Sequence, residues 1–101
     1  LSNIGKILKS QKINQIIDKI NPMANKVSWP EDIIKTRKPK TFEEPIIKFH
    51  NGEIYKGYWN INNQRDGYGI NINPDGEIYK GLWNNDQIGD YGAFFDNEGN
   101  Y

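Results

Sequence analysis

The chain has no cysteine and is nearly without histidine and serine. Because cysteine is absent, neither a disulfide framework nor a thiolate metal site is possible. The only histidine is His50, and the three serines, Ser2, Ser10 and Ser28, all lie before residue 41. A catalytic nucleophile needs a general base within hydrogen-bonding distance. The sequence therefore predicts a non-enzyme with no catalytic residues, no metal site and no cofactor.

Long apolar runs are also missing, since none approaches the roughly 20 residues that span a bilayer. The net charge is zero, but its distribution is uneven. Residues 1–40 hold nine Lys or Arg against three Asp or Glu, a net charge of +6. Residues 41–101 hold four against ten, a net charge of −6. This asymmetry predicts a basic arm on an acidic body, and the acidic body argues against a nucleic-acid partner.

An apolar stripe runs through residues 1–21. Its members are Ile4, Ile7, Leu8, Ile13, Ile16, Ile17 and Ile20. Most of them are three or four residues apart, which predicts an amphipathic helix. The helix should end at Asn21-Pro22, because proline has no amide donor and disfavours helix in the residue before it.

Three alternatives are open for this helix. It could dock on the chain's own repeats, or it could lie in the groove of a partner protein. In the second case Ile13, Ile16, Ile17 and Ile20 are the expected contact residues. It could also be a basic membrane-surface helix or an organelle-targeting segment. The absence of arginine and of aromatic anchors from the helix argues against the last alternative.

Residues 22–45 form an extended linker, according to their composition. Four prolines interrupt the segment, and residues 35–40 read KTRKPK, a basic cluster. Trp29 stands in this polar linker, where a tryptophan usually anchors against another surface. We expect it to contact a partner or to cover the end of the segment that follows.

Residues 55–101 repeat with a period of 23 or 24 residues, which is the signature of a repeat array. The first copy reads YKGYWNINNQRDGYGININPDGEI and the second YKGLWNNDQIGDYGAFFDNEGN. Tyr55, Gly57, Trp59, Gly69 and Gly76 recur as Tyr79, Gly81, Trp83, Gly92 and Gly99. Residues 46–54 resemble the second half of a copy. The array therefore spans residues 46–101, as a half-repeat and the repeats 55–78 and 79–101, and we expect it to continue beyond residue 101.

Each copy is expected to form a β-hairpin. The turns fall at residues 60–66 and 84–89, and the returning strands at residues 67–72 and 91–95. Glycine weakens a strand unless another group must approach closely, so Gly69 should leave room for an indole ring. The predicted fold class is mainly β, with consecutive antiparallel hairpins in an elongated sheet. The N-terminal helix precedes this sheet, and we do not expect the sheet to require it as a separate layer.

The motif Tyr-x-Gly-x-Trp, followed by Gly-x-Gly and a later Gly, resembles the MORN repeat (membrane occupation and recognition nexus). Copy one matches at Tyr55, Gly57, Trp59, Gly67, Gly69 and Gly76. Copy two matches at Tyr79, Gly81, Trp83, Gly92 and Gly99, with Asp90 where the first Gly of Gly-x-Gly belongs. The resemblance implies a rigid, elongated interaction surface in cytoskeletal, ciliary or cortical assemblies of the cytoplasm.

The leading functional hypothesis is a non-catalytic scaffold whose partners are other protein subunits. It would dock through the N-terminal arm and the repeat surface. A second hypothesis is a peripheral membrane module that binds phospholipid through the basic arm. A third is an accessory segment of a larger enzyme, as in some kinases and methyltransferases with MORN segments.

Overall fold

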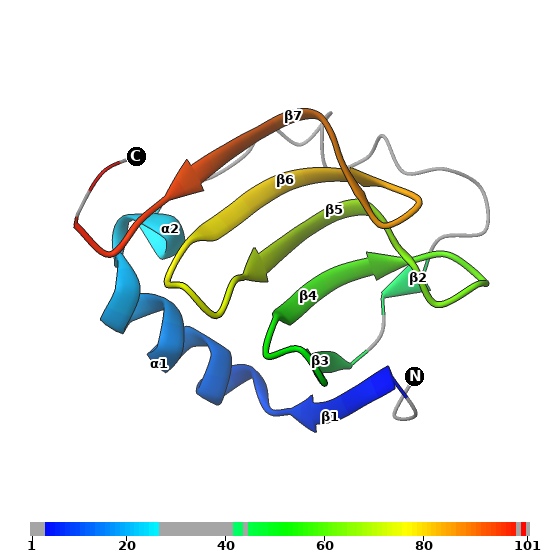
Figure 1. Cartoon of the computed structure of the whole chain (residues 1–101), viewed down its shortest axis with the longest axis horizontal. Coiled ribbons are helices and arrows are strands. Elements are labelled where there is room, and N and C mark those ends of the chain that lie inside the picture. Colours follow the sequence, from blue (N-terminus) through cyan, green and yellow to red (C-terminus); the bar gives the residue numbers. More distant parts are fainter. Residues whose placement is uncertain (1–3, 27–41, 44, 99, 101) are drawn as a thin grey trace.

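The computed structural model describes residues 4–26, 42–43, 45–98 and 100, and shows a single sheet with one helical layer (Figure 1). The strands are β1 (Gly5–Leu8), β2 (Phe42–Glu43), β3 (Ile46–Phe49), β4 (Ile54–Trp59), β5 (Arg65–Ile72), β6 (Ile78–Asn84) and β7 (Gln87–Phe95). The helices are α1 (Ser10–Ile20) and α2 (Met23–Lys26). The expected fold class is thus confirmed at the level of a mainly antiparallel β-sheet.

The strand order is β1-β3-β4-β5-β6-β7, with β2 pairing to β4 beyond the end of β3. From β3 onward each strand lies beside the next one along the chain, so short turns suffice to connect them. The copies align across the sheet, because Gly69 lies opposite both Gly57 and Gly81, and Gly81 lies opposite Gly92.

The two ends of the hairpins have different turns. At one end, Phe49 and Asn73 each begin a five-residue turn whose fourth position is a glycine with positive φ, Gly52 (96°) and Gly76 (94°). At the other end, Asn60 to Gln64 form the first turn and Asn85-Asp86 the second. Asn85 and Asp86 have φ of 49° and 71°, as a tight two-residue hairpin requires.

The strands after these turns begin earlier than the sequence predicts. β5 starts at Arg65 rather than at residue 67, and β7 starts at Gln87 rather than at residue 91. Both segments contain polar residues, which also occur in longer turns. Asn and Asp tolerate positive φ, so two of them complete the second turn and leave the following residues to pair.

The prediction of one helix over residues 1–21 was wrong at its start. Residues 5–8 form β1, which lies beside β3 with Leu8 opposite Ile46. The helix spacing of the isoleucines does not exclude a strand, and β-branched residues favour strands once an edge is available to pair with. The helix that does form is 11 residues long and is followed by the extended residue Asn21.

The predicted linker over residues 22–45 also contains regular structure. α2 occupies Met23–Lys26 and β2 occupies Phe42–Glu43. The side chain of Asn21 accepts a hydrogen bond from the Met23 amide (3.0 Å), which starts α2. Residues 27–41, with Trp29 and the basic cluster, lie outside the described residues, as do residues 99 and 101.

α1 covers one side of the sheet, which we call the helix face. Ile13 and Ile17 of α1 are buried there, together with Ala24 of α2. The sheet supplies Ile46, Ile54, Ile72, Ile78 and Phe95 to this cluster. The expectation that no separate helix layer is needed was therefore wrong, because this row of isoleucines on the helix face requires a cover.

The end of α1 is tied to the sheet by polar contacts as well. Asn21 Nδ2 donates to the carbonyl oxygen of Asn100 (3.0 Å), and Lys80 Nζ donates to that of Ala24 (2.8 Å). The molecule measures 36 × 31 × 21 Å, so it is almost as broad as it is long. Among the helices of the described residues, none is long and apolar enough to cross a membrane.

Candidate functional site

The opposite side of the sheet, which we call the aromatic face, carries the residues that define the repeat. Strand alternation sends Ile54 to the helix face and Tyr55 to this one. Tyr55 meets Trp59 and Trp83 edge-to-face, with ring centroids 4.8 and 5.6 Å apart, and Tyr79 meets Trp83 in the same way at 5.3 Å. The expected row of tyrosine and tryptophan is thus one packed cluster, to which Ile47 also belongs.

The strand glycines make room for tyrosine rings. A Cβ atom on Gly69 would overlap the hydroxyl and two ring carbons of Tyr55, and one on Gly92 would overlap the same atoms of Tyr79. The ring over Gly69 is therefore a phenol and not the indole that the sequence led us to expect. The indole of Trp83 instead directs its Nε1 to the carbonyl oxygen of Gly69 (3.4 Å).

Both phenols are structural groups. The hydroxyl of Tyr55 donates to the carbonyl oxygen of Tyr58 (2.7 Å), and that of Tyr79 donates to that of Leu82 (2.9 Å). Burial raises the pKa of Tyr55 well above its ordinary value, and burial also raises the pKa of Tyr79. Neither hydroxyl can therefore ionise near neutral pH.

A polar cluster centred on Arg65 lies against the aromatic rings. Its Nε donates to a carboxylate oxygen of Asp86, and its Nη1 donates to Glu53 Oε2 (3.2 Å) and Asn71 Oδ1 (2.9 Å). Asn71 in turn donates to Glu53 Oε2 (2.8 Å). The guanidinium carbon lies 4.4 Å from the ring centroid of Trp83, within the range of a cation–π contact.

The charges in this cluster are fixed by their neighbours. Burial would lower the pKa of Arg65, but the hydrogen bond and charge of Asp86, together with Glu53, outweigh it and raise that pKa. Burial would raise the pKa of Glu53, but hydrogen bonds from Asn51 and Asn71 and the charge of Arg65 outweigh it, so that pKa is lowered. Arg65 and Glu53 are therefore both charged near neutral pH, and their contact joins β5 to the turn before β4.

Beside this cluster a cleft of about 350 Å³ opens toward β7. The residues that line it include Tyr79, Trp83, Asp86, Ile88 and Phe94. Ile88 and Phe94 are each 49% exposed, which is high for large apolar side chains beside a packed cluster. The cleft is therefore apolar where β6 and β7 line it, and the ion pairs of Arg65 with Glu53 and Asp86 line the rest of it.

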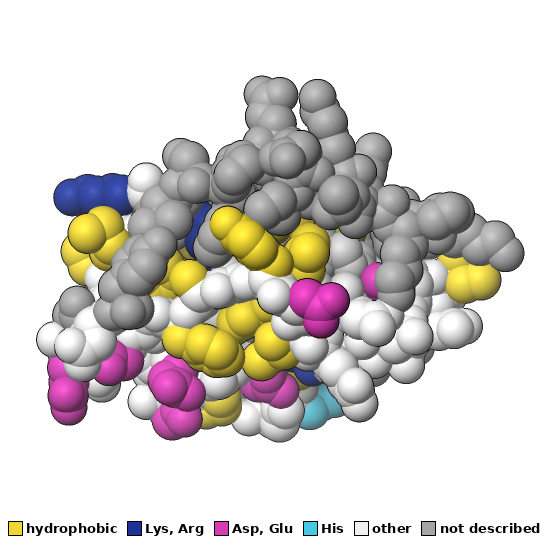
Figure 2. All heavy atoms as spheres, turned by 90° about the horizontal axis from the view of Figure 1, so that it is seen from above, with side chains coloured by type: hydrophobic (Ala, Val, Ile, Leu, Met, Phe, Trp, Pro, Cys, Tyr) yellow, Lys and Arg dark blue, Asp and Glu magenta, His cyan; other side chains and the backbone are white. Residues whose placement is uncertain are grey.

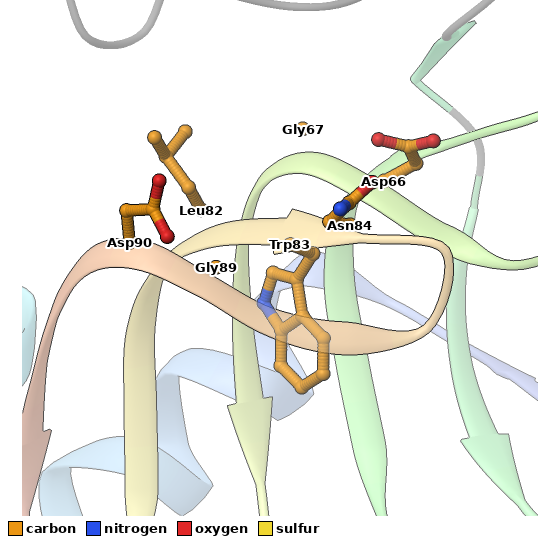
Figure 3. A pocket seen from close by; sticks show the side chains of 7 residues that line it. All are labelled: Asp66, Gly67, Leu82, Trp83, Asn84, Gly89 and Asp90. Carbon is orange, nitrogen blue, oxygen red and sulfur yellow. The ribbon is translucent and has the colours of Figure 1, made fainter.

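A smaller cleft of about 190 Å³ lies on the opposite side of the same strands (Figure 3). Figure 3 shows Leu82 and Asp90 pointing to this side while the indole of Trp83 points to the other. Asp66 also lines the cleft, so two carboxylates from successive repeats face it. Within the described part of the chain, no group of three or more His, Cys, Asp or Glu could hold a metal ion.

The residues predicted to contact a partner lie elsewhere. Ile13 and Ile17 are buried in the helix-face core, and Ile16 and Ile20 pack half-buried against it. This is the alternative in which the helix docks on the chain's own repeats, and a partner could reach Ile13 and Ile17 only if α1 left the sheet. Trp29 lies outside the described residues.

Most repeat-defining residues meet at the aromatic face or in the turns around it. Gly57 and Gly69 lie opposite each other, as do Gly81 and Gly92. Gly67 lies opposite Trp83 with a φ of 99°, a conformation that favours glycine. Gly76 has the same role in the turn before β6, and Gly99 lies outside the described residues.

The Arg65 cluster was missed in the sequence. A signal was present, because Arg65 is one of only two arginines and occupies the position that holds Ile88 in copy two. Asn71 likewise corresponds to Phe94, so copy one has polar residues at two positions where copy two has apolar ones. Such paired differences indicate that equivalent positions in the two copies have different surroundings.

Comparison of the chain with protein-family models, curated proteins and solved structures gives no match in any of the three.

Proposed function

We propose that this protein is a non-catalytic scaffold that binds other proteins through the β7 edge, meaning the outer side of β7 with Ile88 and Phe94. The supporting observation is a comparison of the two copies. Arg65 and Asn71 of copy one are only 8% and 1% exposed, because the next hairpin lies beside them. Their counterparts Ile88 and Phe94 are half exposed, because no described strand lies beyond β7.

The chemistry of this surface fits a protein partner. Large apolar side chains at the centre of an interface, with a charged rim, are typical of binding sites between proteins. Because the motif resembles the MORN repeat, we propose that this scaffold belongs to a cytoskeletal or ciliary assembly.

The position of α1 supports a protein partner over the lipid alternative. An interfacial helix inserts its apolar side into the membrane, but Ile13 and Ile17 are turned toward the sheet. The exposed lysines of α1 could attract anionic lipids only by charge, and the acidic body would oppose them.

The proposal can be tested with three variants in a quantitative pull-down from the native source. Ile88→Asp and Phe94→Asp should each lose the proteins that the unmodified chain retains, because a carboxylate replaces the apolar contact. Ile61→Asp is the matched control, since Ile61 is 64% exposed in the turn between β4 and β5. Equal retention by all three variants would reject the β7 edge as the docking surface. Flotation with anionic vesicles tests the lipid alternative in the same samples.

A further inference from the structure

The two edges of the sheet carry opposite charges. At one edge, β1 and the residue after it expose Lys6 and Lys9. At the other, β7 and the turn after it expose Asp90 and Glu98. No Lys or Arg occurs between residues 81 and 101. Figure 2, which looks onto the molecule from the β7 side, shows Asp and Glu side chains interspersed with hydrophobic ones.

The edges also match in their apolar side chains. One row of residues crosses the whole aromatic face, from strand to strand, in the order Ile7, Ile47, Tyr55, Asn71, Tyr79, Phe94. Ile7 begins the row on β1 and is 51% exposed, and Phe94 ends it on β7 and is 49% exposed. A second copy placed beside the first would continue this row, with Ile7 of one copy against Phe94 of the other.

We propose that copies of this chain associate head to tail, with the β1 edge of one copy on the β7 edge of the next. This inference rests on the proposed function, because it names a second copy as a partner of the β7 edge. Charged edges normally keep sheets apart. Here they repel only like pairs, β1 with β1 and β7 with β7, and leave one attractive arrangement. Since two different surfaces meet, each added copy presents a new β1 or β7 edge, so the contact generates arrays, or rings where the rotation between copies closes.

The expected contact is weak and depends on salt. β1 has only four residues, so the interface is smaller than the roughly 1,200 Å² typical of stable complexes. Its charges are exposed and are screened within about 10 Å at 0.1 M salt. Association should therefore appear at high protein concentration and low ionic strength, and it should weaken as salt is added.

Sedimentation velocity with charge-reversed variants tests the arrangement. The unmodified chain should show a weight-average mass that rises above its 11.7 kDa with concentration and falls with added salt. Lys6→Glu with Lys9→Glu makes both edges acidic, and Asp90→Lys with Glu98→Lys makes both basic. Each double variant alone should stay monomeric, and an equimolar mixture should regain the association, since acidic and basic edges then alternate.

Each other outcome overturns the proposal. A monomeric unmodified chain at every concentration does so directly. Association of the Lys6→Glu, Lys9→Glu variant alone would mean that β7 pairs with β7, because its β7 edge is unchanged. A mixture that stays monomeric would exclude head-to-tail association, provided that circular dichroism shows both variants to be folded. If one variant does not fold, the salt dependence of the unmodified chain decides in its place.

These results are separable from the proposed function. The Lys6→Glu, Lys9→Glu variant keeps Ile88 and Phe94, so it should still retain other proteins in the pull-down even if head-to-tail association is lost. Loss of other partners in Ile88→Asp, with no self-association of the unmodified chain, would support the scaffold and reject this inference.

Discussion

At the scale of single residues, the aromatic face is built from pairs of one large and one small residue. Each repeat places a tyrosine ring over a strand glycine, and the tyrosine hydroxyl satisfies a backbone carbonyl three residues further along. The glycine therefore has a packing role, which the spacing of the repeat suggested. The choice of ring could not be read from the sequence, since tyrosine and tryptophan alternate on the same face and only their side-chain directions decide which one covers the glycine.

Replacing Gly69 with alanine should destabilise the protein by about 3 kcal/mol, because overpacking a buried site forces its neighbours to move. The new Cβ would overlap the ring of Tyr55. Gly89→Ala is the milder comparison, since its Cβ would lie 3.0 Å from the carbonyl oxygen of Leu82 and needs that neighbour to shift by only a few tenths of an ångström. Urea unfolding of both variants measures the difference. Equal losses would mean that the phenol does not pack on Gly69 in solution.

The Glu53 carboxylate should make stability depend on pH. Its folded-state pKa lies below the ordinary value of 4.5, so ionised Glu53 stabilises the fold above that pH, and this contribution is lost as pH falls through the lowered pKa. Glu53→Gln should cost about 1–2 kcal/mol at pH 7 and progressively less on acidification. Glu77→Gln replaces the exposed residue that corresponds to Glu53 one repeat later, and it should have little effect at either pH. Urea unfolding at pH 7 and pH 3 provides the comparison, and a pH-independent cost for Glu53→Gln would contradict the assignment.

At the scale of elements, the hairpins of residues 46–98 could be anticipated and the N-terminal elements only in part. The hairpins repeat their residues, so that one copy supports the interpretation of the other. β1 has no such support, because Ile4, Ile7 and Leu8 fit a helix and a strand equally well. Its pairing to β3 is a contact between distant parts of the chain, and local periodicity cannot indicate such a contact.

The docking of α1 gives a stability prediction. Ile13→Ala should cost about 2–4 kcal/mol, because it leaves a cavity in a side-chain cluster where Ile13 is fully buried. Gln15→Ala on the exposed side of α1 should change stability by no more than about 0.5 kcal/mol. Thermal unfolding of the two variants distinguishes a core role from a partner role. If Ile13→Ala is as stable as the unmodified chain but loses partners, the helix acts as a docking element after all.

At the scale of the whole molecule, the helix face and the aromatic face depend on each other. The sheet has apolar residues on both sides, and a sheet with one uncovered apolar side is unstable in water. The expectation that the sheet needs no separate helix layer came from the aromatic face, whose rings pack on one another. Ile54 and Ile78 lie one repeat apart in the sequence, and together with Ile72 they indicate a second apolar side that needs a cover.

A truncated chain that starts at residue 23 should therefore lose its cooperative unfolding. It lacks β1 and α1, and so exposes the row from Ile54 to Phe95. Near-ultraviolet circular dichroism of the tryptophans and the dispersion of amide signals in nuclear magnetic resonance would both report the loss. Retention of the native spectra would mean that the repeats fold without the helix layer.

The length of α1 has a consequence for how such a chain can grow. Eleven helical residues span about 16 Å, and the five strands from β3 to β7 span about 19 Å at their usual spacing. Figure 1 shows α1 running from the β1 side toward the β7 side, with α2 continuing it. The length of α1 thus nearly matches the width of the sheet that it covers. An inserted hairpin would outgrow its cover, whereas a neighbouring copy would bring a cover of its own.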